Sequence, residues 1–492
     1  MISPDASSVL SRVAQAIASR GVQAHLVGGT VRDLLRGQAT RDIDVAVSTD
    51  ALALARELAP LLGGHLVPLD AERGIARIVV PGGSDDSWWL DLTSAESGIH
   101  DDLAMRDFTV DAMAVPLEAA AVGNFDALID PHGGRADLHD RIIRTVSPSA
   151  LRADPARLLR APRLAAQLGF EIEPSTEKQI RHEAHLVASI APERVRDELL
   201  KLLAPRGATV ALRRLDSLGL LTRVLPELEE ARGVTQPKEH YWDVFNHLLE
   251  TAGQVEDMIG CGDGKQDFVV ELRPAFDSIE SYFDASVSDG HTRSTLLKLA
   301  GLLHDVSKPA TRTVEPTGRI RFLGHHTEGS QVSERALGRL RMSRKGIVAV
   351  STMVHHHLRP SQMAQKGETP SRRAVYRYYR DVGDVAVDTL YLNLADYLAA
   401  RGPNLGRQEW VEHCRIVGHI LREGLEQKAP QTLTKLLDGH DIMHTFDLRP
   451  GPQVGRLVEL VREARASGEV TTKDEALRLV ETNLDAGGAG GA

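Results

Sequence analysis

The sequence predicts a mixed α/β head followed by a mostly α-helical chain. Two patterns carry this prediction. Short β-branched and apolar runs bounded by turn residues are confined to about the first 145 residues, whereas runs of Ala, Leu, Arg and Glu at helical spacing fill the rest. The length of 492 residues suits roughly two to four domains.

Composition excludes several classes of protein. With 42% hydrophobic and 26% charged residues, the chain is typical of soluble globular proteins, and no apolar run approaches the ~18 residues of a membrane span. The N-terminus lacks the basic-then-apolar order of a signal peptide. Because the chain has only two cysteines, Cys261 and Cys414, disulfides are not expected. We therefore expect a cytoplasmic protein with no membrane partner.

Changes of pattern divide the chain into four regions. The strands expected in the head are 24–27, 42–47, 75–80, 88–93 and 108–115. The regions are the head at 1–145, a helical neck at 146–230, a helical domain at 231–405 and a helical tail at 406–492. We expect almost no strands after the head, and disorder in the Gly-rich end at 485–492.

Charge is distributed unevenly. The net charge of −10 by itself argues against nucleic-acid binding. However, the window 335–380 holds eleven Lys or Arg residues against one acidic residue, and 141–163 holds six Arg against one Asp. In the first window, RRAVYRYYR places three tyrosines among four arginines. This suits RNA backbone and bases, but a basic helix that packs its tyrosines inward explains it equally well.

One short segment of the head combines features of a nucleotide site. The expected strand AHLV runs into Gly28 and Gly29 and then into a helix beginning near Val31, so backbone N–H groups can approach phosphate oxygens. Asp42 and Asp44 follow at i and i+2 of the next strand, which places both carboxylates on one face. Hard oxygen ligands of this kind favour Mg²⁺. The segment predicts a magnesium-dependent phosphate site.

Several ordered motifs carry a family resemblance. GGTVRD with RDID, MRDFTVDAMAV, DPHGGRADLHDRIIRTV and ADPARLLRAPRLAAQLGF together span about residues 24–170. They resemble the class II tRNA nucleotidyltransferases, which comprise the CCA-adding enzymes and the related bacterial poly(A) polymerases. The resemblance implies a nucleotidyltransferase-fold head, a neck with a nucleotide-selecting helix and an RNA-binding region, and tRNA, CTP and ATP as partners.

The resemblance also implies roles for single residues. Asp42 and Asp44 would hold the catalytic Mg²⁺ ions, with Asp91 on the strand WWLDLT as the third catalytic carboxylate. The expected nucleotide-binding residues in the head are Gly28, Gly29 and Arg32 at the triphosphate and Arg106 and Asp107 at the ribose. Asp33 is expected to be structural.

The neck contributes the expected base-selecting residues. Asp154 with Pro155 predicts a helix start, so Asp154 and Arg157 would share one helix face with Arg160 and Arg163. A carboxylate accepts from the amino group that cytosine and adenine carry, and a guanidinium donates to ring acceptors. The resemblance implies that these residues select CTP and ATP; an ordinary surface ion pair is the alternative.

Some positions depart from the family pattern. Met105 replaces the first Arg of the family's RRD, Asp111 replaces its Asn, Ala153 replaces an acidic residue, and Pro162 falls inside the selecting helix. Only fourteen residues separate Asp91 from Arg106, whereas many CCA-adding relatives carry a longer loop here. Because loop length is linked in this family to the switch from CTP to ATP, an enzyme that adds only CC or only A is an open alternative.

A second set of residues lies in the region 231–405. His247, the doublet His304-Asp305 and Asp396 occur in order along helical segments, and imidazole and carboxylate are common ligands of catalytic divalent metals. The set resembles the metal-dependent HD phosphohydrolase superfamily, which implies a metal of unspecified identity at these four residues. His325 and His355 are expected to complete a second metal site or to contact substrate.

The sequence therefore predicts a magnesium-dependent tRNA nucleotidyltransferase that adds CMP and AMP to the tRNA 3′ end without a template, fused to an HD domain and a helical tail. The alternatives are a CC- or A-adding specialist, a poly(A) polymerase, and an HD phosphohydrolase whose head only binds RNA. His440 and His444 in the tail are expected at the surface. The oligomeric state is left open.

Overall fold

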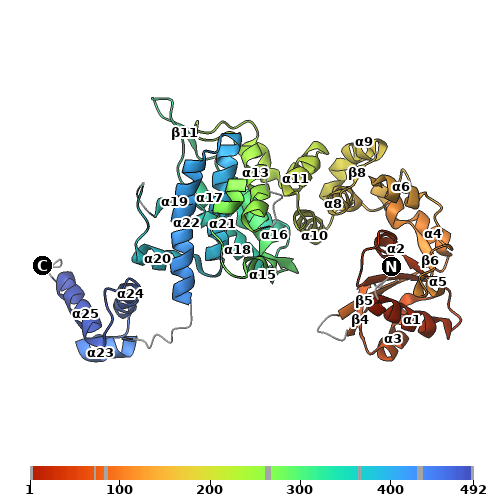
Figure 1. Cartoon of the computed structure of the whole chain (residues 1–492), viewed down its shortest axis with the longest axis horizontal. Helices are drawn as coiled ribbons and strands as arrows, with labels where there is room; N and C mark the ends of the chain where they lie inside the picture. The colour runs from red at the N-terminus through yellow and green to blue at the C-terminus, as the bar shows by residue number, and fades with distance from the viewer. Residues whose placement is uncertain are drawn as a thin grey trace. The chain divides into compact units, whose positions relative to one another are not determined.

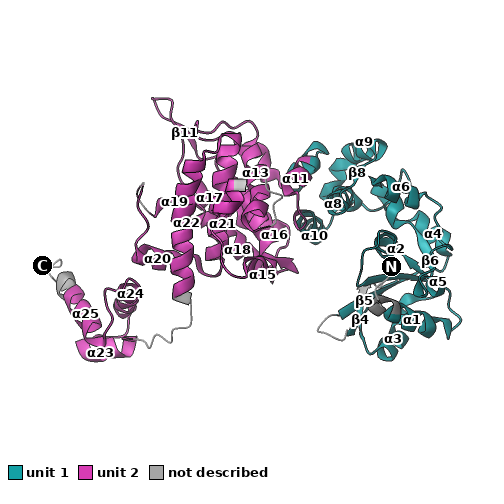
Figure 2. Cartoon of the chain, in the orientation of Figure 1, with its two compact units in different colours: residues 1–202, 214–224 teal, residues 203–213, 225–492 magenta. Residues whose placement is uncertain are grey.

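The computed structural model describes residues 4–70, 74–81, 87–260, 267–363, 365, 367–428 and 436–488. The chain divides into two compact units, Met1–Leu202 with Arg214–Val224 and Leu203–Arg213 with Leu225–Ala492 (Figure 2). The first unit begins with a sheet flanked by helices, and the second is mainly helical (Figure 1). The predicted α/β head followed by helical regions is confirmed.

A six-stranded mixed sheet forms the head, in the order β3-β4-β5-β2-β1-β6. Its strands are β1 (Ala24–Val27), β2 (Asp42–Val47), β3 (His65–Asp70), β4 (Ile75–Pro81), β5 (Ser87–Ser94) and β6 (Ala114–Pro116). β2 and β5 pair in parallel, and the other neighbouring strands pair antiparallel. The parallel pair joins two strands that lie far apart in the sequence.

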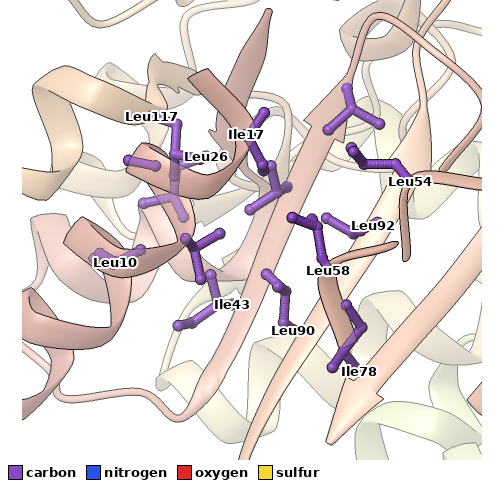
Figure 3. Packing of buried hydrophobic residues seen from close by; sticks show 14 of the residues in the cluster. Leu10, Ile17, Leu26, Ile43, Leu54, Leu58, Ile78, Leu90, Leu92 and Leu117 are labelled. Carbon is purple, nitrogen blue, oxygen red and sulfur yellow. The ribbon is translucent and has the colours of Figure 1, made fainter. Parts of the chain in front are cut away.

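One face of the sheet forms the hydrophobic core of the head. Ile43 on β2 and Leu90 on β5 pack there against α1 (Pro4–Ala18) and α3 (Ala51–Leu62) (Figure 3). Full burial of each such side chain contributes roughly 1.5–3 kcal/mol. Because side chains alternate along a strand, this packing directs the neighbours of Ile43 and Leu90 to the opposite face.

The remaining head elements differ in two places from the expectation. The helices are α2 (Gly28–Leu35), α4 (Ile99–Ala104), α5 (Leu117–Ala121) and α6 (Gly134–Asp140). The helix expected near Val31 therefore begins already at Gly28. The strand expected at 108–115 is wrong in its first half, where η1 (Thr109–Asp111) is a 3-10 turn. The Thr109 hydroxyl donates to Asp137 at 2.6 Å, so the chain turns toward α6 before it enters β6.

The neck is helical, with one small pair of strands. Its elements are β7 (Ile142–Ile143), α7 (Ala150–Ala153), α8 (Arg157–Leu168), β8 (Glu171–Ile172), α9 (Pro174–Glu183), η2 (Ala184–Ser189), α10 (Pro192–Leu203), α11 (Ala208–Ser217), α12 (Leu221–Val224) and η3 (Pro226–Ala231). α8 begins at Arg157, two residues after the predicted first helical residue Pro155. Asp154 is extended, its carbonyl accepts from the Arg157 N–H at 3.1 Å and its carboxylate accepts from the Ala156 N–H at 3.2 Å, as a helix-capping residue does. The same carboxylate also binds Arg194.

The second unit is a bundle of helices with two short hairpins. Its helices are α13 (Val244–Met258), α14 (Asp267–Leu272), α15 (Ile279–Asp284), α16 (Arg293–Leu303), α17 (His325–Arg339), α18 (Arg344–His356), α19 (Arg359–Gln362), α20 (Arg372–Val382), η4 (Gly383–Val385), α21 (Ala386–Arg401), η5 (Gly402–Asn404) and α22 (Arg407–Lys428). The hairpins are β9 (Ser286–Ser288) with β10 (His291–Thr292) and β11 (Arg312–Val314) with β12 (Ile320–Phe322). With β8, these strands of two or three residues agree with the expectation of almost no strands after the head.

The tail forms its own small core. It contains α23 (Gly439–Phe446), α24 (Pro452–Ala466) and α25 (Lys473–Gly488), whose apolar side chains pack together. Of the end expected to be disordered, 485–492, the first four residues are assigned to α25 and the last four lie outside the described part. Among the described helices, none is both long and apolar enough to cross a membrane.

Candidate active sites of the two units

Three carboxylates lie on the face of the head sheet that is turned away from the core. Asp42 and Asp44 flank the buried Ile43 on β2, and Asp44 stands directly opposite Asp91 in the parallel β2–β5 register. Arg77 on β4 is in turn the register partner of Asp91. The structure thus brings the three acidic residues predicted to be catalytic onto one face, which we call the carboxylate face.

The start of α2 is held close to these carboxylates. The Thr30 hydroxyl accepts from the Asp44 N–H at 2.8 Å and lies 3.0 Å from the Asp42 carbonyl oxygen. Gly28 has φ +67°, and a Cβ there would lie 2.7 Å from Arg106 Nη1 and 3.3 Å from Asp44 Oδ2. Only glycine fits this approach without strain. Thr30 was missed at the sequence level, although it stands inside GGTVRD.

Electrostatics at the carboxylate face favour a bound cation. Burial raises the pKa of Asp44 to about 6, and the charges of Asp91 and Asp42 act in the same direction, against the opposing effect of Arg106. Burial also raises the pKa of Asp42. Carboxylates that repel one another in a partly buried site are stabilised by a divalent ion, for which oxygen ligands suit Mg²⁺.

The arginines predicted to bind the triphosphate and ribose are held by acidic neighbours. Arg32 Nη1 donates to Asp111 at 2.6 Å, and Arg32 also pairs with Asp33 at 2.9 Å. Arg106 Nε donates to Asp102 at 2.8 Å. Asp111 thus has a visible role in this chain, because it orients Arg32. Sequence reasoning recorded Asp111 only as a departure from the family pattern.

Asp107 and two arginines of α8, Arg160 and Arg163, form one partly buried network with Glu198. Arg160 donates to Asp107 at 2.9 Å and to Glu198 on α10 at 3.3 Å, and Arg163 donates to Glu198 at 2.5 Å. Although burial opposes it, the charge of Arg160 lowers the pKa of Asp107. The network therefore connects the segment after α4 to the neck. Glu198 is a member that sequence reasoning missed, because no motif marks it.

Asp154 and Arg157 each bind groups other than the predicted pair partner. Asp154 precedes α8 and receives two bonds from Arg194, at 2.9 and 2.7 Å. Arg157 instead donates to the carbonyl oxygens of Met105 at 2.6 Å and Ala150 at 3.1 Å. The pKa of Asp154 is lowered against the effect of burial, by its bonds to Arg194 and also by the charge of Arg157, so the two residues remain electrostatic neighbours.

In the second unit, the four predicted metal ligands converge. Their ligand atoms all lie within 4.8 Å of one another. His247 Nε2 on α13 lies 3.0 Å from Asp396 Oδ1 on α21 and 3.3 Å from Asp305 Oδ2, and His304 Nε2 lies 3.1 Å from the same Asp305 oxygen. This donor set of imidazole and carboxylate fits a divalent transition metal.

A second group shares Asp305. Asp305 Oδ1 lies 3.1 Å from His325 Nε2 at the start of α17 and 3.6 Å from His357 Nε2 after α18. His357, rather than the expected His355, joins this group, because His355 lies against the rings of His326 and His356. The run of three histidines at 355–357 indicated a ligand in this segment. Its spacing alone did not show which of the three rings points toward Asp305.

Backbone contacts orient three of these imidazoles for coordination. The Nδ1 atoms of His304, His325 and His357 lie 2.6 to 2.8 Å from backbone carbonyl oxygens. A carbonyl only accepts, so each Nδ1 donates to it and each Nε2 faces the cluster, where a bound metal ion would take the place of any proton on that atom. Burial lowers the pKa of His304, but Asp305 and Asp396 outweigh it and raise that pKa to about 10. The cluster therefore attracts positive charge.

A basic cavity opens on this cluster. It has a volume of about 1000 Å³ and is bordered by Asp305, His325, His357 and Asp396. Lys238, Lys308, Arg319 and Arg321 also line it. Cationic walls beside a metal-ligand cluster suit a phosphorylated substrate.

The basic helix α20 packs against the tail. Arg377 donates to Glu463 on α24 at 2.9 and 2.7 Å, and Arg373 and Arg380 bind the same carboxylate at 3.3 and 2.9 Å. Tyr378 is buried and donates to the Ala386 carbonyl at 2.6 Å. These contacts favour the packing interpretation of RRAVYRYYR over an open RNA surface.

Three family models match the chain in order. A poly A polymerase head domain matches residues 24–144, a probable RNA- and SrmB-binding site of polymerase A matches 169–232, and an HD domain matches 267–401.

Relatives match over nearly the whole length. An A-adding tRNA nucleotidyltransferase from Deinococcus radiodurans is 37% identical over 93% of this chain and 95% of its own. A CC-adding tRNA nucleotidyltransferase from Thermus thermophilus is 34% identical over 92% of this chain and 91% of its own. The solved structure of a Thermotoga maritima CCA-adding enzyme complexed with tRNA covers 98% of both chains with a TM-score of 0.59 at 22% identity, and so supports the fold.

Proposed function

The chain belongs to the tRNA nucleotidyltransferase family, and from this we propose that it transfers nucleotides from CTP or ATP to the 3′ end of tRNA at the carboxylate face. The observation that carries the proposal is the placement of Asp42, Asp44 and Asp91 on one face beside the glycine start of α2. We propose that this reaction takes place in the cytoplasm, where tRNA and nucleoside triphosphates are available.

The chain's residues divide the chemical task. Asp42 and Asp44 would hold Mg²⁺, which supplies activation of the RNA 3′-hydroxyl and neutralisation of the departing pyrophosphate. Thr30 fixes the backbone of Asp44. Gly28 lets backbone N–H groups approach the triphosphate. Arg32 and Arg106, oriented by Asp111 and Asp102, carry positive charge beside the same site.

We propose further that the enzyme adds part of the CCA end, either CC or A alone. The two full-length relatives described above are partial adders. In addition, only residues 95–98 connect β5 to α4, so the segment whose length is linked in this family to the switch from CTP to ATP is short. An enzyme that uses one nucleotide has no such switch to make.

Single-nucleotide incorporation tests this directly. Purified protein is incubated with Mg²⁺ and tRNA that lacks one or three terminal nucleotides, together with labelled CTP or labelled ATP. A CC-adding enzyme would add two C residues to the tRNA that lacks three nucleotides and no A to the tRNA that lacks one. An A-adding enzyme would add one A to the tRNA that lacks one nucleotide and no C to the tRNA that lacks three. Either result would support partial addition. Complete CCA synthesis contradicts that step, long A tracts identify a poly(A) polymerase, and no incorporation overturns the transferase proposal.

Carboxylate variants test the site. Asp42→Ala and Asp44→Ala are each expected to reduce addition at least about 100-fold, because both remove a metal ligand. Asp50→Ala, which removes the cap of α3 on the same head, is the matched control and should retain addition. Undiminished addition in either metal-ligand variant contradicts the assignment.

We propose a second, metal-dependent phosphohydrolase activity for the cluster of His247, His304, Asp305 and Asp396. Its support is the shared Asp305, the three oriented imidazoles and the basic cavity. Release of phosphate from phosphate monoesters or cyclic phosphates in the presence of Mn²⁺, Ni²⁺ or Co²⁺ tests it. Absence of metal-dependent release with both substrate types would contradict this activity.

A further inference from the structure

Trp89 is a large aromatic side chain exposed beside the catalytic carboxylates. It is 41% exposed. It points to the same side of β5 as Asp91, two residues later, and it stands opposite Asp42 in the parallel β2–β5 register. Its neighbour Leu90 points into the core instead. The carboxylate face therefore combines metal-ligand chemistry with an open aromatic ring.

Arg77 joins this ring to the carboxylates. Its guanidinium makes two bonds to Asp91, at 2.7 and 2.8 Å, and its Cζ lies 5.7 Å from the centroid of the Trp89 ring. A cation held over an aromatic ring at this distance is attracted to it. The position of Trp89 is thereby coupled to that of Asp91.

The open end of the face is the end at which Trp89 lies. The other end is covered by a small cluster of Val27, Ala46, Leu103 and Ala114. In the proposed reaction the triphosphate lies at Gly28, beside Asp44. In-line attack requires the 3′-hydroxyl to approach from the side opposite to the leaving pyrophosphate. In that reaction the 3′-hydroxyl would approach from the side of Asp42 and Trp89, which stand two residues before Asp44 and Asp91 along the parallel strands.

We propose that Trp89 stacks on the base of the 3′-terminal nucleotide of the tRNA primer, and that Arg77 is a positioning residue that holds the ring beside Asp91. The inference rests on the proposed transferase function. Stacking suits this task because every base has an aromatic face, so one platform accepts the different terminal bases that successive tRNA substrates present.

Steady-state kinetics of the full chain test the stacking role. Trp89→Ala is expected to raise KM for tRNA roughly 10-fold or more, with kcat and KM for the nucleoside triphosphate within about twofold of wild type. Trp89→Phe should restore most of the loss. Val122→Ala is the control, since it truncates a 79% exposed side chain directly after α5, a helix that packs against α1.

Fluorescence separates this inference from the transferase proposal. Addition of tRNA without nucleotide should quench tryptophan emission of the wild type, and the quench should be reduced in Trp89→Phe. An unchanged KM for tRNA in an active Trp89→Ala variant overturns the inference, as does a rise confined to KM for the nucleoside triphosphate. If the wild type adds no nucleotide, the transferase proposal fails. A fluorescence quench that depends on Trp89 would then still show that RNA binds at this ring.

Discussion

At the scale of single residues, the ionised form of Asp44 is unfavourable for the stability of the head. Its carboxylate is partly buried on a face that also holds Asp42 and Asp91, and burial with these charges raises its pKa to about 6. A folded carboxylate with a raised pKa is destabilising when ionised. Ionised Asp44 therefore lowers the stability of the head, and a bound cation offsets this loss.

This pKa predicts a pH dependence at limiting Mg²⁺. The ionised Asp44 binds the cation, so the addition rate should rise from pH 5 to pH 7 with a midpoint near pH 6, and more Mg²⁺ should move the midpoint to lower pH. Protonation of Asp44 relieves a cost, so its titration does not itself unfold the head as pH falls. Thermal unfolding at each pH is the control. A midpoint pH that does not change with the Mg²⁺ concentration contradicts the prediction.

At the scale of elements, the docking of α24 on α20 turns a basic helix into an internal surface. Glu463 lies at its centre and is 7% exposed. Three arginines of α20 converge on it, and the arginines lower the pKa of Glu463. The locally high positive charge of 335–380 is thus partly balanced by two glutamates, Glu459 and Glu463, of a helix that lies far along the chain.

Glu463→Gln should loosen this docking. Loss of the negative charge leaves Arg373, Arg377 and Arg380 without their common partner, so the local unfolding free energy of α24 should fall by roughly 1 kcal/mol, a value discounted for the partial exposure of the arginines. Hydrogen exchange of the α24 amides measures it. Glu469→Gln is the control, since Glu469 lies 3.9 Å from Arg373 and is 52% exposed. Equal exchange in both variants would falsify the prediction.

At the scale of the whole molecule, two chemical centres occupy separate compact units. The carboxylate face lies in the first unit, and the cluster around Asp305 lies in the second. Each centre is built from side chains of its own unit. A defect at one centre is therefore expected to leave the chemistry of the other intact.

Asp305→Ala tests this separation. Asp305 is 1% exposed and belongs to both groups of the second unit, so its removal should abolish metal-dependent phosphate release and lower metal affinity measured by calorimetry. Nucleotide addition to tRNA should stay within about twofold of wild type. Ser333→Ala, at a buried site on α17, controls for nonspecific damage to the bundle. Parallel loss of both activities would contradict separate centres.

The sequence by itself determined what depends on spacing within one element. The alternation of a strand placed Asp42 and Asp44 on one face. The set of His247, His304-Asp305 and Asp396 also meets in the structure, but it was found from the resemblance to the HD superfamily, because its members lie on different helices. The packing alternative for RRAVYRYYR was also visible, because tyrosines at helical spacing can face inward.

Only the tertiary structure decided which side chains from different elements meet. The antiparallel β4–β5 register sets Arg77 against Asp91, the bundle selects His357 over His355, and α10 brings Arg194 to the Asp154 carboxylate. Local spacing follows from the geometry of a single helix or strand. Partners across elements follow from register and packing, which depend on the burial of many side chains at once.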